Sequence, residues 1–201
     1  ETVVAWVNQG SPLGDADIVP PAADLPNPDE WTFAAEFGAP DHIIGSVPMD
    51  IPASGNDLWS KHYVSSGAVE DRCIKAVQVK PRGDAKAVVH HANSDLQVMN
   101  ADGEYEDFGQ LTEYAMGKWG EVMPDGVCRT LPKNSRVAWD IHMFPGGIGA
   151  MAPGSVIKDN VVEIGLWFHD DDFIAKTEPY KQDLRLYQLR SGYEGGHLIV
   201  P

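Results

Sequence analysis

Short strand-like runs separated by turn signals restrict the fold of this chain more than any other feature of its sequence. Residues 72–80 alternate between apolar and polar side chains, and further strand-like runs cover 86–90, 136–144, 161–168 and 182–189. Clusters rich in proline, glycine, asparagine and aspartate separate these runs at 81–84, 100–103, 124–126, 132–135, 145–147 and 158–160. This spacing is typical of an antiparallel β-sandwich. Because 43% of the 201 residues are hydrophobic, such a sandwich can bury a substantial core.

Three segments depart from the β pattern. Residues 1–8 place apolar side chains at helical spacing before Gly10, and residues 110–118 predict two helical turns. Prolines recur between 11 and 40, which predicts an extended linker laid over a surface. The expected organisation is therefore a tail helix of an upstream domain at 1–10, the linker at 11–40, the sandwich at 41–192 and the lead into a further domain at 193–201.

The charge of the chain disfavours anionic partners, and its hydropathy argues against a membrane-spanning helix. A formal net charge of −15 disfavours nucleic acid and anionic membranes, because the electrostatic contribution to such binding would be repulsive. No apolar stretch approaches the roughly 18 residues that a membrane-spanning helix needs. A well-solvated surface is the simplest interpretation of the acidic side chains.

Three histidines form the candidate metal site. His90 and His91 are adjacent and follow the apolar run 87–89, and His142 lies in a second strand-like run. Strands far apart in the sequence can meet in one sheet, so the three imidazoles can converge. Neutral imidazole ligands suit copper or zinc.

The adjacent histidines impose a structural condition on this site. Successive residues of a regular strand face opposite sides of a sheet, so His90 and His91 cannot both reach one ion unless the strand ends or bulges there. On the second run, Asp140 shares a face with His142. Asp140 is therefore the expected hydrogen-bonding partner that orients a ligand imidazole.

The two cysteines, Cys73 and Cys128, belong to no CxxC or haem-attachment spacing. They form either one disulfide, which suits an oxidising compartment, or two buried thiols that pack as small apolar side chains. A disulfide closing this loop would stabilise the fold by roughly 4 kcal/mol on the chain-entropy estimate.

Three stretches of the sequence resemble a known family. They are the run from Cys73 to Pro81, the run from Val88 to His91, and the run from Leu131 to His142. Together they resemble the first domain of the copper type II, ascorbate-dependent monooxygenases, the family of peptidylglycine alpha-hydroxylating and dopamine beta-monooxygenases, and bacterial homologues in particular. The resemblance covers roughly residues 40–190.

The resemblance implies a jelly-roll-like sandwich in which His90, His91 and His142 bind an electron-transfer copper. It also implies a small reductant such as ascorbate, a second copper domain in the same protein and, in bacterial members, an upstream cytochrome-c-like domain. The family's catalytic copper uses an H-x-H pair, and these 201 residues contain none. We therefore expect this chain to pass electrons without completing the hydroxylation, and we expect a secreted or periplasmic location.

Two other interpretations use the same residues. A zinc hydrolase would place water opposite the three histidines and would need a general base such as Asp140. Alternatively, the sandwich binds no metal and serves as a structural or interaction module.

Overall fold

Antiparallel strands make up most of the chain. The computed structural model describes residues 2–14, 27–52, 54–115, 118, 120–124, 126–145, 154–170, 173 and 197–199. Its helices are α1 (Thr2–Asn8), α2 (Ala34–Phe37) and the 3-10 helix η1 (Gly83–Ala87). Its strands are β1 (His42–Gly45), β2 (Met49–Pro52), β3 (Leu58–Ser65), β4 (Arg72–Pro81), β5 (Val89–Met99), β6 (Tyr105–Ala115), β7 (Gly120–Val122), β8 (Val127–Leu131), β9 (Arg136–Met143), β10 (Val156–Asn160), β11 (Val162–Phe168) and β12 (His197–Ile199).

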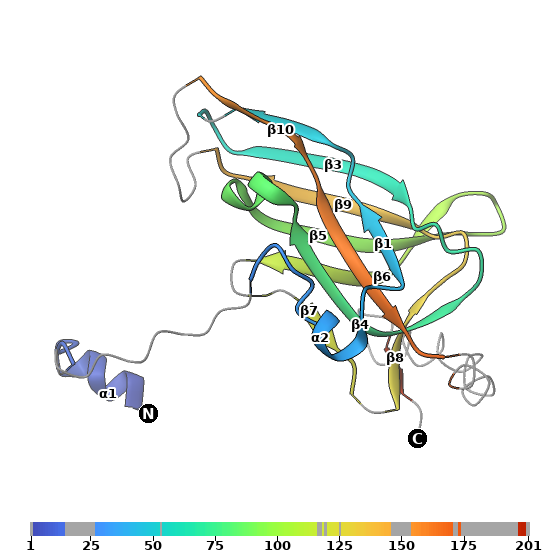
Figure 1. Ribbon diagram of the computed structural model, residues 1–201. Coiled ribbons are helices and arrows are strands. Elements are labelled where there is room, and N and C mark those ends of the chain that lie inside the picture. The colour runs from blue at the N-terminus through green and yellow to red at the C-terminus, as the bar shows by residue number, and fades with distance from the viewer. Residues whose placement is uncertain are drawn as a thin grey trace.

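These strands form two main sheets that cross one another in two layers (Figure 1). The four-stranded sheet has the order β3-β9-β5-β6, and the six-stranded sheet has the order β1-β11-β4-β8-β12 with β7 paired to β4. A two-stranded ribbon, β10-β2, extends the structure. The arrangement confirms the predicted all-β antiparallel sandwich with a short N-terminal helix.

The core lies between the two sheets. On β9, Val137, Trp139 and Ile141 are buried, and they belong to the same apolar cluster as Ile74 and Leu166 of the other sheet. The residues between them on β9 face outward, as the two-residue period of a strand requires. The outer face of the four-stranded sheet is therefore free to carry polar chemistry.

The outer face of the six-stranded sheet is covered by residues 27–40. Trp31 packs edge-on against Trp167 with ring centroids 6.1 Å apart, and the Trp167 indole N–H donates to the carbonyl of Gly38. A Cβ at Gly165 would lie 2.8 Å from the Trp31 ring, so glycine allows this close approach. Residues 27–40 thus pack on this sheet and contain the helix α2, whereas the proline-rich sequence predicted an extended linker.

The cysteines confirm one of the two alternatives left open by the sequence. Cys73 on β4 and Cys128 on β8 form a disulfide, with Cα atoms 5.4 Å apart and a sequence separation of 55. Both residues are buried. The bond joins two neighbouring strands of the six-stranded sheet.

Two local predictions were wrong. Residues 110–115 are not helical but form the end of β6. Gln110 and residues 112–115 pair with β5, and Leu111 and Thr112 are buried, so long-range pairing and burial override local propensity. The expected strand at 86–90 is instead the end of η1 followed by the start of β5, which runs on for eleven residues.

Two expectations concern the C-terminal part of the chain. The strand expected at 182–189 lies outside the described residues. Residues 193–201 were expected to lead into a further domain, and within them β12 pairs with β8 of the six-stranded sheet. Among the described residues, none of the helices combines the length and the apolar character needed to cross a membrane.

Candidate metal centre

A β-bulge brings the two adjacent histidines to one side of the four-stranded sheet. Val89 pairs with Met143 and His91 pairs with His142, so the register between β5 and β9 shifts and His90 is the extra residue. A bulge bends its strand and redirects a side chain. The condition set by the sequence, that the strand must end or bulge at the pair, is therefore met by a bulge.

The three imidazoles converge through the same ring atom. The Nδ1 atoms of His90 and His142 are 3.2 Å apart, and the Nδ1 atom of His91 lies 3.4 Å from each of them. With a metal–nitrogen distance of about 2.05 Å, these separations correspond to nitrogen–metal–nitrogen angles of roughly 100–115°. Three nitrogens thus occupy three corners of a near-tetrahedral site whose fourth position is not provided by this cluster.

This triangle suits a cation. Three ring nitrogens with converging lone pairs cannot all be satisfied by sharing protons, because a single N–H satisfies only one neighbour. A metal ion accepts all three lone pairs at once. The described part of the chain therefore contains a three-histidine group, His90, His91 and His142, that could hold a metal ion.

The partner of His142 fixes which ring atom faces the triangle. Its Nε2 atom lies 2.8 Å from Oδ2 of Asp57, which immediately precedes β3. An imidazole that donates N–H to a carboxylate presents its other nitrogen as a lone pair, and such partners raise ligand basicity. Asp57 therefore prepares His142 Nδ1 for a metal.

Trp59 covers the same ligand from the neighbouring strand. It pairs directly with His142 in the β3–β9 register, and the two rings stack with centroids 4.2 Å apart and planes 9° apart. Its indole also meets His91 edge-on at 5.4 Å. The His142 residue is only 9% exposed under this indole, whereas Trp59 itself is 56% exposed.

Burial and neighbouring charges together favour the neutral form of His91. Burial lowers the pKa of the His91 imidazole, and the neighbouring imidazoles of His142 and His90 lower it further. The carboxylates of Asp140 and Glu113 act in the opposite direction. Because metals bind neutral imidazole, the lowered pKa keeps His91 available as a ligand at neutral pH.

Asp140 lies on the expected face, but it does not orient His142 in this structure. Its Oδ2 atom pairs with the Lys61 ammonium at 2.9 Å, and its Oδ1 atom is buried without a hydrogen-bond partner. The hydrogen bond expected from Asp140 to a ligand is made to His142 by Asp57 instead. Asp140 acts on the site through its charge, which favours protonation of His91.

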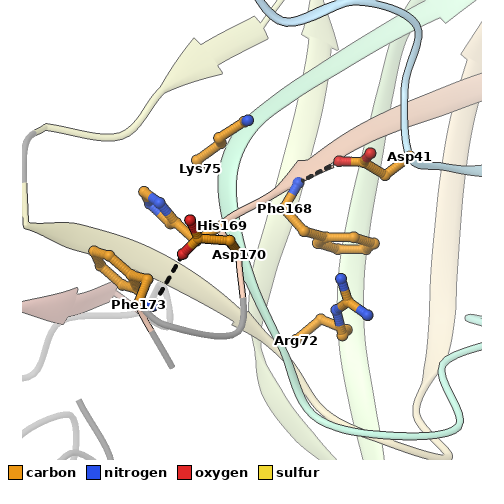
Figure 2. Close-up of a pocket in the computed structure, with 7 residues that line it drawn as sticks. All are labelled: Asp41, Arg72, Lys75, Phe168, His169, Asp170 and Phe173. Atoms are coloured by element: carbon orange, nitrogen blue, oxygen red, sulfur yellow. Dashed lines mark hydrogen bonds between the residues drawn. The ribbon is translucent and has the colours of Figure 1, made fainter. Parts of the chain in front are cut away.

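A separate pocket of about 540 Å³ lies at the other end of the sandwich. Arg72, the first residue of β4, lines it, whereas η1 leads from the last residue of that strand to His90 and His91 near the start of β5. Figure 2 shows the Asp41 carboxylate accepting the N–H of Phe168 and the Asp170 carboxylate accepting the N–H of Phe173. Both carboxylates are thus committed to backbone groups, and the pocket is distinct from the metal centre.

Sequence reasoning missed Asp57 and Trp59. Neither lies in a run that the sequence assigned to a strand, and 85 residues separate Asp57 from His142. Residues 58–65 alternate in burial along the whole of β3, but their sequence does not show it, because Leu58 and Trp59 are adjacent apolar residues, as are Tyr63 and Val64. No period of two therefore marks this strand in the sequence.

Comparison with known proteins identifies no family. Neither the models of protein families nor the curated proteins give a match to this chain. Among solved structures, a mutant VP2 protein of infectious bursal disease virus, in derived T=1 particles, is similar at 13% identity with a TM-score of 0.22. The match covers 62% of this chain and 32% of the viral chain. At this TM-score the likeness supports no conclusion about function, which rests on the site alone.

Proposed function

We propose that this chain is the electron-transfer copper domain of a copper-dependent monooxygenase, in which three histidines hold a copper that passes electrons to a second copper site absent from this chain. The observation that carries the proposal is the triangle of Nδ1 atoms of His90, His91 and His142, with sides of 3.2–3.4 Å. Its ligand set agrees with the set implied by the family resemblance of the sequence.

Each part of the site has a role in this proposal. Copper, when bound, supplies a one-electron couple between its cuprous and cupric states. His90 and His91 are held by the bulge and His142 by Asp57, so the ligands are placed before the metal arrives. A ligand set built on paired strands moves little between two oxidation states, which suits electron transfer.

The partners and the location belong to the same proposal. The electrons come from a small reductant such as ascorbate and leave to a second copper domain of the same protein, and a cytochrome-c-like domain precedes the sandwich. The Cys73–Cys128 disulfide supports a secreted or periplasmic location, because disulfides persist in oxidising compartments.

Copper titration followed by electron paramagnetic resonance tests this function. We expect one cupric ion per chain with a type 2 signal, and loss of that signal in His91→Ala. His62→Gln is the matched control, because His62 is a half-buried imidazole on β3 that bonds to the Val47 N–H. Unchanged copper stoichiometry in His91→Ala would refute the proposed ligand set.

A zinc hydrolase is the second candidate, because the near-tetrahedral triangle also fits a three-histidine zinc site. Its general base is harder to supply. Asp57 is engaged by His142, and Asp140 has one oxygen paired with Lys61 and the other buried. Ester hydrolysis by the zinc-loaded chain that the copper-loaded chain lacks would favour the hydrolase.

A metal-free structural module remains distinguishable from both. A metal that binds only the folded chain raises the melting temperature, and the rise grows with the logarithm of the ratio of free metal concentration to dissociation constant. A melting temperature that is unchanged by copper, by zinc and by a chelator would favour the metal-free module.

A further inference from the structure

We propose that Trp59 is the residue through which electrons enter the metal centre, an inference that rests on the proposed copper function. Its indole is the exposed side chain that stacks on a buried ligand, with the ring of His142 4.2 Å away and nearly parallel. The same indole meets His91 edge-on at 5.4 Å. Trp59 therefore contacts two of the three ligands.

The strand register makes this contact part of the fold. Trp59 and His142 are direct cross-strand partners on β3 and β9, and side chains so placed are held close together. Trp59 belongs to the outward-facing residues of β3, alternating with inward-facing neighbours. The indole is thus fixed over the imidazole while much of its surface faces solvent.

His142 and Trp59 differ sharply in their exposure to solvent. His142, the most buried of the three ligands, is 9% exposed, whereas Trp59 is 56% exposed. A reductant approaching from this side meets the indole before it meets His142. The path from solvent to the metal through this ligand then consists of two stacked aromatic rings.

The reductant that fits this entry is a planar conjugated enediol. Aromatic rings bind other π-systems by offset stacking or edge contact, and the exposed indole offers such a surface. In each event the enediol loses one electron and releases one proton to solvent, which leaves its semi-oxidised radical. With copper bound, the electron would cross the indole and the His142 imidazole and convert cupric to cuprous copper. The enediol loses the one electron that copper gains, and the released proton carries the positive charge that copper gives up.

A purely structural role for Trp59 makes a different prediction. An indole that only holds the His142 ring in place would change copper affinity when it is removed, and the rate of reduction of the copper that remains bound would stay the same. An entry residue changes the reduction rate at equal copper occupancy. The two roles are therefore separated by measuring both quantities in the same variants.

The experiment uses the copper-loaded full chain with ascorbate in a stopped-flow instrument, following loss of the cupric signal. We expect Trp59→Leu to slow reduction by about tenfold, a change of about 1.4 kcal/mol in the barrier, with the copper dissociation constant little changed. Trp59→Phe keeps a smaller ring and should fall between wild type and Trp59→Leu. Tyr63→Leu is the matched control, because Tyr63 is another exposed aromatic residue on the same face of β3, and there we expect the wild-type rate.

A second measurement does not depend on reduction. Cupric copper quenches the emission of an indole that contacts its ligand, so addition of cupric ion should remove more fluorescence from wild type than from Trp59→Phe. Wild-type reduction rates in Trp59→Leu at equal occupancy, or loss of copper from that variant, would overturn the entry role. A wild-type chain that binds no copper would instead refute the proposed function, and this inference with it.

Discussion

Removing the carboxylate that holds His142 should weaken metal binding without unfolding the sandwich. Asp57 accepts from His142 Nε2 at 2.8 Å, and its side chain is 49% exposed. Partners of metal-bound histidines typically contribute 10–100-fold to affinity. Because half of the Asp57 side chain is in contact with solvent, we expect Asp57→Asn to lie near the lower end, at about tenfold, which corresponds to about 1.4 kcal/mol.

The assay is a competition titration of copper against a chelator of known affinity at neutral pH. Asp50→Asn is the matched control, because Asp50 is 51% exposed and pairs with Lys158 on the β10-β2 ribbon. We expect wild-type copper affinity in Asp50→Asn. Equal dissociation constants for wild type and Asp57→Asn would refute the orienting role of Asp57, as would an equal loss of affinity in the two variants.

Three further predictions concern pH, the disulfide and the covering segment. Copper affinity should fall as pH falls, because each imidazole must lose its proton to bind. Since the pKa of His91 is lowered from its ordinary value, this residue stays neutral to lower pH than an ordinary histidine, and copper occupancy measured between pH 8 and 5 checks the loss. Replacing both Cys73 and Cys128 with serine should lower the free energy of unfolding by roughly 4 kcal/mol in urea titrations, and the reducing agent that destabilises wild type should leave this variant unaffected. Gly165→Ala should destabilise the chain by about 1–3 kcal/mol in thermal melts, because its Cβ would meet the Trp31 ring at 2.8 Å, and an unchanged melting temperature would contradict that packing.

The sequence predicted the sandwich because three of its strands, β4, β9 and β11, were recognisable from their apolar pattern. β9 and β11 were expected at nearly their observed bounds, since their apolar side chains recur at the period of a strand. Residues 110–115 were mistaken for helix because the pairing of β6 with β5 is a contact between distant residues, and no local pattern reports it. The same limit hid α2, whose position depends on packing over the six-stranded sheet.

The metal site, too, could be predicted only in part from the sequence. The three histidines could be found from their residue type and from strand-like runs, and the need for a break at His90 followed from strand geometry. Asp57 and Trp59 could not be found from the sequence, because their contacts with His142 arise from the pairing of β3 with β9. From the sequence, Asp140 was the best candidate because it lies on the same strand as His142. The carboxylate that bonds to His142 is instead Asp57, which precedes the neighbouring strand β3.

The bulge at His90 makes the metal site depend on the number of residues in β5. A regular ladder would leave His91 and His142 as a cross-strand pair, with the neighbouring histidine directed to the opposite face. Loss of one codon at position 90 could therefore convert a three-ligand centre into a two-ligand one without altering any core side chain. Gain of one codon could create it, so an insertion within a strand is a short evolutionary route between a sandwich that binds a metal tightly and one that does not.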